Sequence, residues 1–348
     1  MDVLIVSWNG VKDVGGVERV TYYLSQAMKE NANVVVISLD ELRRGAAKFF
    51  LGIHPAIDAI IVSVYVKSII KTMLGSGKKR EDIKVISQGF NAPFVKADIA
   101  FAHGTMRQYK MNVFSDNRWR VNQIYEKIAF KNAGLVAAVA NHVKEELYEL
   151  YDVPLEKIHV IHNAIDTEKF KPEYEKKDDA IHIIFVGRLE KRKGVEKLLE
   201  LAEYIEKADN LFLHIATPDR NGADAFSGLS RTTITCGIDR ESMVKFYNEG
   251  DVMFLPSLYE GFEMVTIECL SCGVPVIGNS VGAIGDLFQW GNNGVAILSG
   301  EMEKDIKSIR TLANYYRIRE NKTKLHDDIS KEFGLARYYK QVNALLGF

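Results

Sequence analysis

Short apolar runs rich in valine and isoleucine recur along the chain, and longer amphipathic segments separate many of them. In the first half these runs are 3–8, 33–39, 59–64, 83–90, 99–104, 135–140 and 158–163. Continuous apolar runs bounded by Gly, Asp or Asn are typical of buried strands in parallel sheets. The pattern therefore predicts βαβ units, and this constrains the fold more than any other feature.

The same pattern starts again after the charged, proline-containing segment 171–180, which suits a linker. The second series of runs is 181–187, 211–216, 232–237, 252–257, 274–279 and 294–299. A chain of 348 residues is long enough for two domains. We therefore predict the α/β class, with two Rossmann-like, doubly wound domains. Open α/β sheets bind ligands beyond the carboxyl ends of their strands, so functional side chains are expected in the loops there.

Composition limits the partners and the location. The net charge of -1 disfavours nucleic acid as a partner. Three cysteines fit a reducing compartment, and Asp2 stands where a signal peptide would carry a basic residue. The apolar window 56–74 is interrupted by charged residues, so it does not suit a membrane span. We predict a cytoplasmic protein that could touch the inner membrane surface. The basic and aromatic segment 107–131 could serve a membrane surface or an acceptor, but a helix that packs its aromatic face into the first domain is the favoured interpretation.

Two strand-to-helix loops could hold phosphates. Gly15 and Gly16 precede a helix expected from about Val17, where exposed N–H groups suit a phosphate, although a plain turn is equally compatible. In the second half, Arg188 and Lys193 lie in a loop and could clamp a diphosphate from two sides. The alternative is a solvated basic loop, because two more basic residues lie between them. Neither loop matches the dinucleotide or P-loop fingerprint.

Two carboxylates bracket the segment 257–279. Glu260 is expected in a loop after a strand, and Glu268 about one turn into the following helix, with Gly261 allowing the chain to turn between them. A carboxylate that accepts two hydroxyl hydrogen bonds recognises a polyol, so one could bind a sugar and the other a ribose. Cys269 and Cys272 form a C-x-x-C pair that we interpret as buried helix packing.

These motifs together resemble the retaining GT-B glycosyltransferases of family 4, which include glycogen and sucrose synthases. The resemblance covers nearly the whole chain. It rests on the glycine loop at 15–20, His103-Gly104, the inter-domain segment 160–170, the Gly-Arg-Leu…Lys-Gly motif at 187–194 and the Glu-x7-Glu block from Glu260 to Glu268. It implies two facing domains with a cleft: an acceptor domain (1–165), a donor domain (166–325) and a terminal helix (326–348) that packs back on the first.

The resemblance also implies roles for individual residues. Arg188, Lys193, Glu260 and His103 would act on the donor diphosphate and the transferred sugar. Donor binding would involve Gly15, Gly16, Gly261, Phe262, Glu263, Met264, Val265 and Glu268. The implied activity is hexosyl transfer with retention, from a nucleotide-sugar donor (UDP-sugar favoured over GDP-sugar) to a glycan or lipid-linked acceptor. The expected route is cell-surface polysaccharide or glycolipid synthesis. Neither a metal nor another cofactor is expected.

One departure from the family pattern stands within the block. Glu263 occupies the position where the family usually has glycine, and its side chain could crowd the sugar-binding backbone or change sugar selectivity. Three other functions therefore stay open: a subunit that binds a sugar nucleotide without transferring it, a sugar-nucleotide epimerase, and a glycoside hydrolase using the two carboxylates. The hydrolase hypothesis leaves Arg188 and Lys193 unexplained.

Overall fold

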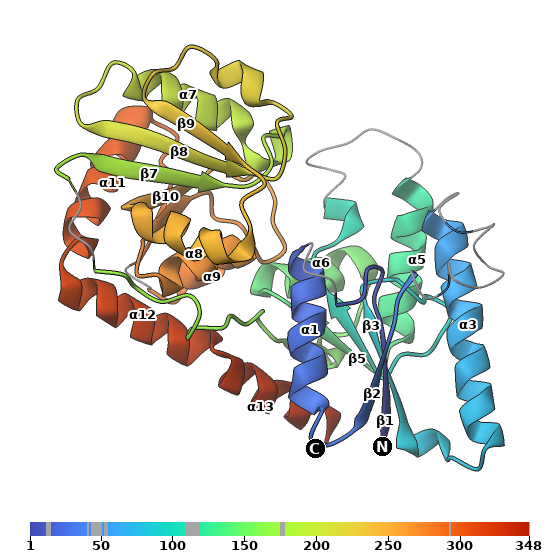
Figure 1. Cartoon of the computed structure of the whole chain (residues 1–348). Coiled ribbons are helices and arrows are strands. Elements are labelled where there is room, and N and C mark those ends of the chain that lie inside the picture. Colours follow the sequence, from blue (N-terminus) through green and yellow to red (C-terminus); the bar gives the residue numbers. More distant parts are fainter. Residues whose placement is uncertain are drawn as a thin grey trace. The chain divides into compact units, whose positions relative to one another are not determined.

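The computed structural model describes residues 1–11, 15–39, 42, 51, 55–108, 119–174, 178–291 and 294–347. The chain divides into two compact units (Figure 1). Unit 1 contains Met1–Ala164 and Leu335–Phe348, and unit 2 contains Ile165–Gly334. Unit 2 is therefore inserted, in sequence, between the two parts of unit 1.

In unit 1, the described residues form a parallel six-stranded sheet in the order β2-β1-β3-β4-β5-β6. Its strands are β1 (Asp2–Val6), β2 (Asn33–Ile37), β3 (Ile83–Gln88), β4 (Ile99–Ala102), β5 (Leu135–Ala138) and β6 (Ile158–Val160). Its helices are α1 (Gly16–Met28), α3 (Pro55–Gly75), α5 (Trp119–Asn132), α6 (Asn141–Tyr151) and α13 (Leu335–Leu346), with the 3-10 helices η2 (Arg80–Asp82) and η3 (Leu155–Lys157).

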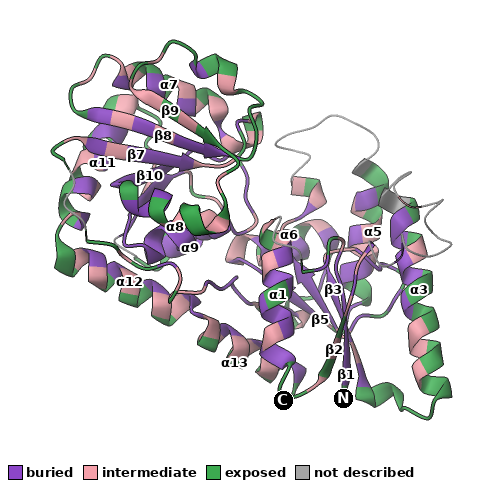
Figure 2. Ribbon diagram, in the orientation of Figure 1, coloured by how far each residue is buried: buried purple, intermediate pink, exposed green. Residues whose placement is uncertain are grey.

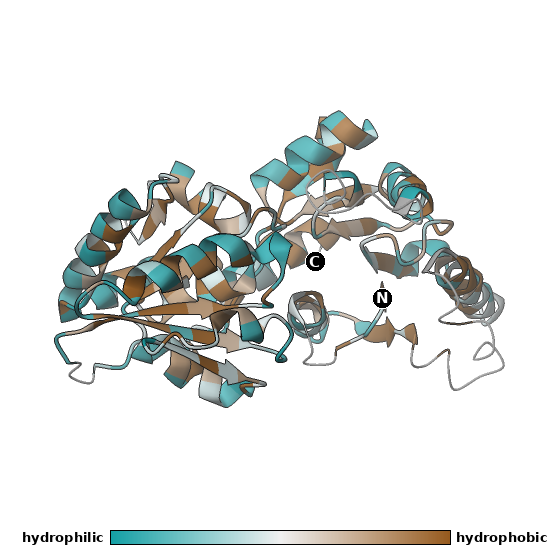
Figure 3. Ribbon diagram, turned by 90° about the horizontal axis from the view of Figure 1, so that it is seen from above, coloured by the Kyte–Doolittle hydropathy of each residue, from teal (hydrophilic) through white to brown (hydrophobic). Residues whose placement is uncertain are grey.

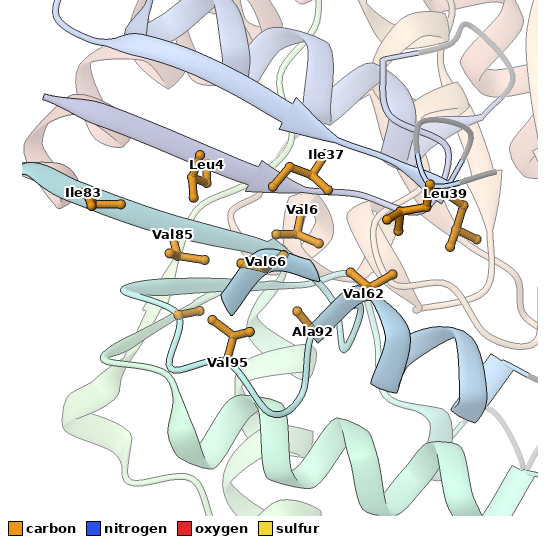
Figure 4. Packing of buried hydrophobic residues seen from close by; sticks show 12 residues of the cluster. Leu4, Val6, Ile37, Leu39, Val62, Val66, Ile83, Val85, Ala92 and Val95 are labelled. Carbon is orange, nitrogen blue, oxygen red and sulfur yellow. The ribbon is translucent and has the colours of Figure 1, made fainter. Parts of the chain in front are cut away.

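The strand predicted at 59–64 is wrong, because these residues lie inside helix α3. Val62 and Val66, one helical turn apart, pack with Leu4 and Val85 of the sheet (Figure 4). Val64, between them in the sequence, is 63% exposed. A short apolar run does not distinguish a buried strand from a helix by its periodicity. The burial of residues i and i+4 shows that one helical face makes this part of the core.

The end of the chain contains two helices that belong to different units. Residues 326–333 complete α12 (Arg319–Phe333), which is part of unit 2, while α13 contacts α1 within unit 1. Gly334 stands between them with extended backbone angles, and it forms a bridge with Ile165. The segment expected as one terminal helix from residue 326 is thus interrupted at Gly334.

In unit 2, the described residues form a second parallel six-stranded sheet, in the order β12-β11-β10-β7-β8-β9. Its strands are β7 (Ile181–Val186), β8 (Leu211–Thr217), β9 (Thr232–Cys236), β10 (Val252–Leu255), β11 (Val276–Gly278) and β12 (Val295–Ile297). Its other helices are α7 (Val195–Ile205), α8 (Arg240–Glu249), α9 (Met264–Ser271), α10 (Gly282–Gln289) and α11 (Met302–Tyr316), with η4 (Lys191–Lys193) and η5 (Ala223–Phe226).

The strands of both sheets are mostly buried, and the helices carry exposed polar stripes (Figures 2 and 3). In the central strands, burial of both sheet faces explains why they read as continuous apolar runs instead of alternating ones. The edge strands β2 and β9 are more exposed. None of the helices in the described part of the chain has the length and hydropathy needed to cross a membrane.

Cys269 and Cys272 are packing residues, as the sequence indicated. Cys269 and Cys272 are fully buried at the end of α9, whereas Cys236 is exposed at the end of β9. Burial raises the pKa of the Cys272 thiol to about 12, so this residue stays protonated and unreactive.

We therefore expect one of the three thiols to react rapidly with a disulfide reagent in the native protein. All three should react after unfolding in urea, when the α9 pair becomes accessible. Absorbance of the thiolate released from the reagent measures the number of reactive thiols in the native and in the unfolded protein. Cys236→Ser is the control that should abolish the rapid phase. Fast reaction of two or three native thiols would contradict the burial of α9.

Candidate functional site

The loops that follow β7 and β10 lie against each other in unit 2. Gly194 has a φ of +74°, and a Cβ atom at this position would lie 2.0 Å from the carbonyl oxygen of Pro256. The backbone N–H of Leu258 donates to the carbonyl oxygen of Arg192 at 2.8 Å. Only glycine fits the left-handed backbone in this space. The basic loop is thereby placed on the loop that carries Glu260.

Lys193 and Arg192 both bind the carboxylate of Glu260. Lys193 Nζ is 2.5 Å from Glu260 Oε1, and Arg192 Nη1 is 3.3 Å from Oε2. Arg192 also donates to the carbonyl oxygen of Tyr259 and to Glu190. The three charged side chains are largely buried, which strengthens their attraction. The alternative of a solvated basic loop is therefore wrong for Arg192, since η4 turns residues 192 and 193 inward together.

Arg188 lies in the same loop but remains open to solvent. Its side chain is 64% exposed, and its guanidinium is 3.8 Å from the carboxylate of Glu190. A pair at this distance and exposure holds the side chain weakly. An anion arriving from solvent could therefore bind Arg188 at little cost.

Glu268 lies inside helix α9, as predicted, and its side chain is buried. The hydroxyl of Tyr247 in α8 donates to Glu268 Oε2 at 2.7 Å. Tyr247 is a partner that the sequence did not indicate, because it lies 21 positions away on another helix. The hydrogen bond from Tyr247 thus fixes the orientation of the buried Glu268 carboxylate.

The residues from Gly261 to Val265 lead from the loop into α9. Phe262 is buried, and its ring lies 5.7 Å from that of Phe333. Helix α9 begins at Met264. In any α-helix the first N–H groups lack an intrahelical acceptor, so those of Met264 and Val265 can bind an anion. The start of α9 is the position that the family resemblance assigns to binding of the nucleotide-sugar donor.

The side chain of Glu263 points into the protein, toward the start of α10. Its Oε1 accepts from the Thr266 hydroxyl at 2.9 Å and from the Ile284 N–H at 3.2 Å, and its Oε2 accepts from the Ala283 N–H at 2.9 Å. Burial, and secondarily the charge of Glu260, raises the pKa of Glu263 to about 7.

In unit 1, His103 follows β4 and lies beside Gln88. His103 Nε2 is 2.5 Å from Gln88 Oε1, and burial lowers the pKa of His103 to about 4. The imidazole is therefore neutral near pH 7, with Nε2–H donating to Gln88 and Nδ1 left as an acceptor. Glu126 accepts the Met106 N–H at 2.7 Å and so holds the loop after His103.

The glycine loop of unit 1 carries a carboxylate of its own. Helix α1 begins at Gly16, and a Cβ atom on Gly15 would lie 2.5 Å from Glu18 Oε2. Asn9 Nδ2 donates to Glu18 Oε1 at 2.6 Å and so holds this carboxylate at the helix start. A negative group beside the glycines weakens the case for a phosphate there. Residues 12–14, which precede the glycine loop, and residues 109–118 of the basic, aromatic segment lie outside the described residues.

Among the described residues, no group of three or more His, Cys, Asp or Glu side chains could hold a metal ion. The candidate site of unit 2 is thus composed of the Glu260 ion pairs, the exposed Arg188 and the start of α9. Such a set can bind a polyanion through the cations and the helix N-terminus, and a polyol through the carboxylates.

Comparisons with known proteins cover both halves of the chain. Residues 166–325 match the family model "Glycosyl transferases group 1", and residues 14–169 match "Glycosyltransferase Family 4". An uncharacterized glycosyltransferase of Methanocaldococcus jannaschii is 30% identical over 178 residues, which are 46% of each chain. The alpha-D-kanosaminyltransferase of Streptomyces kanamyceticus is 26% identical over 49% of each chain. The chain thus spans about half the length of these curated relatives.

Solved structures are similar over the whole chain. A sucrose-phosphate synthase from Thermosynechococcus elongatus has a TM-score of 0.78 at 17% identity, covering 99% of this chain and 98% of its own. The Anabaena protein HepE, solved in complex with UDP-glucose, has a TM-score of 0.71 at 15% identity, covering 100% and 99%. These likenesses confirm the predicted GT-B fold.

The contact at Gly194 makes a stability prediction. Gly194→Ala should lower the free energy of unfolding by about 2 kcal/mol or more, because the new Cβ would overlap the Pro256 carbonyl. Gly228→Ala is the matched control: Gly228 also has a positive φ (+84°), but its Cβ would meet no atom within 4 Å. Urea unfolding of both variants measures the difference. If both variants lost the same free energy of unfolding, the positive φ alone would explain the loss and the contact with Pro256 would not contribute.

Glu263 makes a pH prediction. The folded protein keeps the Glu263 proton up to about pH 7, whereas the unfolded chain releases it near pH 4.5. Between these values the unfolded state binds fewer protons, so the contribution of Glu263 to stability falls as pH rises, by up to about 1.4 kcal/mol per pH unit. Unfolding free energies of the wild type minus those of Glu263→Gln, measured from about pH 4.5 to 8, should decline and then level. A flat difference would contradict the raised pKa.

Proposed function

The chain belongs to the family 4 glycosyltransferases, the glycosyl transferases group 1, and from this premise we propose that it is a retaining hexosyltransferase. The donor in this proposal is a nucleoside-diphosphate sugar, and the acceptor is a hydroxyl of a glycan or a lipid-linked saccharide. The observation that carries the proposal is the contact of Lys193 and Arg192 with Glu260 beside the start of α9. This contact joins cations suited to a diphosphate with a carboxylate suited to a sugar.

The donor diphosphate would bind between Arg188, Lys193 and the first turn of α9. Arg188 is exposed and pairs only loosely with Glu190, so it can turn toward a phosphate. Lys193 would share its ammonium between the phosphate and Glu260. Arg192 would keep hold of the Glu260 carboxylate during this exchange, since it contacts the other carboxylate oxygen. Glu260 could then accept hydrogen bonds from sugar hydroxyls, and Glu268 would serve the ribose.

The chemistry proposed for this chain needs positioning and charge stabilisation. As the bond from the sugar to the diphosphate breaks, negative charge grows on the leaving phosphate, and Arg188 and Lys193 would stabilise it. The acceptor hydroxyl would attack from the same face and pass its proton to the leaving phosphate. His103 in unit 1 is neutral because its pKa is lowered, so in this proposal it would act as a hydrogen-bond acceptor through Nδ1 instead of as a charged acid.

One solved structure and one helix surface support the type of donor and the setting of the reaction in this proposal. HepE binds UDP-glucose, which favours a UDP-sugar over a GDP-sugar here. Helix α3 exposes Ile60 and Val64, and Lys67 and Lys71 follow on the same helix. Apolar and basic residues together suit an anionic membrane surface. This supports a cytoplasmic enzyme that meets a lipid-linked acceptor at the inner membrane surface, in polysaccharide or glycolipid synthesis.

We expect Arg188→Ala and Glu260→Ala each to reduce sugar transfer by at least ~100-fold, the scale of losing one transition-state contact. Lys191→Ala is the matched control: it removes an exposed charge from the same loop, and it should leave the rate within about threefold of the wild type. Steady-state release of nucleoside diphosphate in the presence of acceptor measures the rates. Near-normal rates for Arg188→Ala or Glu260→Ala would refute their assignment.

Calorimetric titration with UDP, GDP and ADP tests the donor site itself. One nucleotide should bind preferentially, and Arg188→Ala should weaken it by about tenfold or more, because a charge-assisted contact is lost. Absence of binding to all three would refute the proposal and favour a screen for glycoside hydrolysis. Binding without acceptor-dependent turnover would point to a binding subunit, and conversion of the donor without acceptor would point to an epimerase.

A further inference from the structure

Glu263 makes contacts that the proposed transfer chemistry does not use. Its carboxylate accepts three hydrogen bonds: one from Thr266 within α9, and two from the backbone N–H groups of Ala283 and Ile284 in α10. The first N–H groups of a helix have no partner within the helix. One side chain from the start of α9 thus satisfies the start of α10 and joins the two helices.

The start of α10 also lies directly behind Glu260. Gly282, the first residue of α10, has a φ of +56°. A Cβ atom at Gly282 would lie 1.8 Å from Glu263 Oε2 and 2.9 Å from Glu260 Cβ. The Glu263 carboxylate therefore fills the space that any other residue at 282 would need. Glu263, Gly282 and Glu260 form one packed contact.

Glu260 is consequently held from two directions. Lys193 and Arg192 bind its carboxylate oxygens, and the first turn of α10 supports its Cβ. When a phosphate draws Lys193 away, the support from α10 remains. A glycine with a left-handed φ gives this turn little rigidity of its own, so its position depends on the hydrogen bonds to Glu263.

We propose that Glu263 is a positioning residue: its carboxylate fixes the first turn of α10 behind Glu260 and thereby orients Glu260 toward the transferred sugar. The inference rests on the proposed function, because it assigns the sugar to Glu260. It differs from the sequence hypothesis that Glu263 crowds the sugar-binding backbone, since it gives the carboxylate the task of binding the N–H groups at the start of α10. It also predicts that substitution of Glu263 impairs recognition of the sugar and leaves the affinity for the nucleotide unchanged.

The test compares Glu263→Gln and Glu263→Ala with Thr266→Val at about pH 8, where Glu263 is mostly ionised because this pH lies above its raised pKa. The Gln substitution replaces one acceptor oxygen by an amide that faces a backbone N–H, and the Ala substitution removes all three hydrogen bonds. Thr266→Val removes one hydrogen bond to the same carboxylate but keeps both contacts to α10. Both Glu263 variants should lower kcat/KM for the sugar nucleotide by about 10- to 100-fold, the cost of a small misplacement of a substrate-binding group. Thr266→Val should stay within about threefold.

Two further readouts separate positioning from general damage. The Kd of the preferred nucleoside diphosphate, measured by calorimetry, should change less than about threefold in all three variants. Hydrogen–deuterium exchange should accelerate in peptides covering 257–263 and 279–289 of Glu263→Ala, while peptides from α7 and from unit 1 exchange as in the wild type. A loss of nucleotide affinity equal to the loss of kcat/KM would overturn the inference, as would unchanged exchange in both peptides.

Failure of the proposed function gives a different result. A wild-type protein that binds no nucleotide and transfers no sugar refutes the transferase. The exchange measurement still decides whether Glu263 holds the Glu260 loop, because it needs no substrate.

Discussion

The close approach of Gly194 to the Pro256 carbonyl determines the geometry of the candidate site. A side chain at 194 would separate the two loops, and the Lys193–Glu260 pair could not form at 2.5 Å. The strands β7 and β10 are neighbours in the sheet, so their carboxyl ends are brought together by the fold itself. The glycine then reduces the remaining gap to van der Waals contact. Backbone sterics, more than charge attraction, therefore place the cations on the carboxylate.

Two buried carboxylates three residues apart are stabilised by different means. Glu260 is compensated by two cationic side chains, which can move and exchange partners. Glu263 is compensated by the backbone N–H groups of Ala283 and Ile284 at the start of α10. An uncompensated buried charge would cost several kcal/mol, a cost that the two cations offset for Glu260. The backbone N–H groups offset part of that cost for Glu263, and the raised pKa of this residue shows that the offset is incomplete.

The sequence predicted the parallel sheets, the start of α9 near Met264 and the position of Glu268 inside it, because these depend on local patterns. It failed at 59–64, where a helix and a strand share the same run of apolar residues. It also missed the contact of Arg192 with Glu260, the close approach of Gly282 to Glu260 and the hydrogen bonds of Glu263 to α10. These depend on which loops meet in space, and one sequence contains no signal for contacts between positions 192 and 260 or 263 and 283. Tyr247 was missed for the same reason.

The insertion of unit 2 within unit 1 has a consequence for biosynthesis. Helix α13, which packs on α1, can be made only after the whole of Ile165–Gly334 has been translated. At ordinary elongation rates of ~5–20 residues per second, this interval lasts on the order of ten to thirty seconds. During that time part of the apolar surface of α1 has no cover, although the sheet beneath it is already complete. The nascent chain is then most exposed to chaperones and to aggregation, and a ribosome that stalls within unit 2 leaves unit 1 in that state.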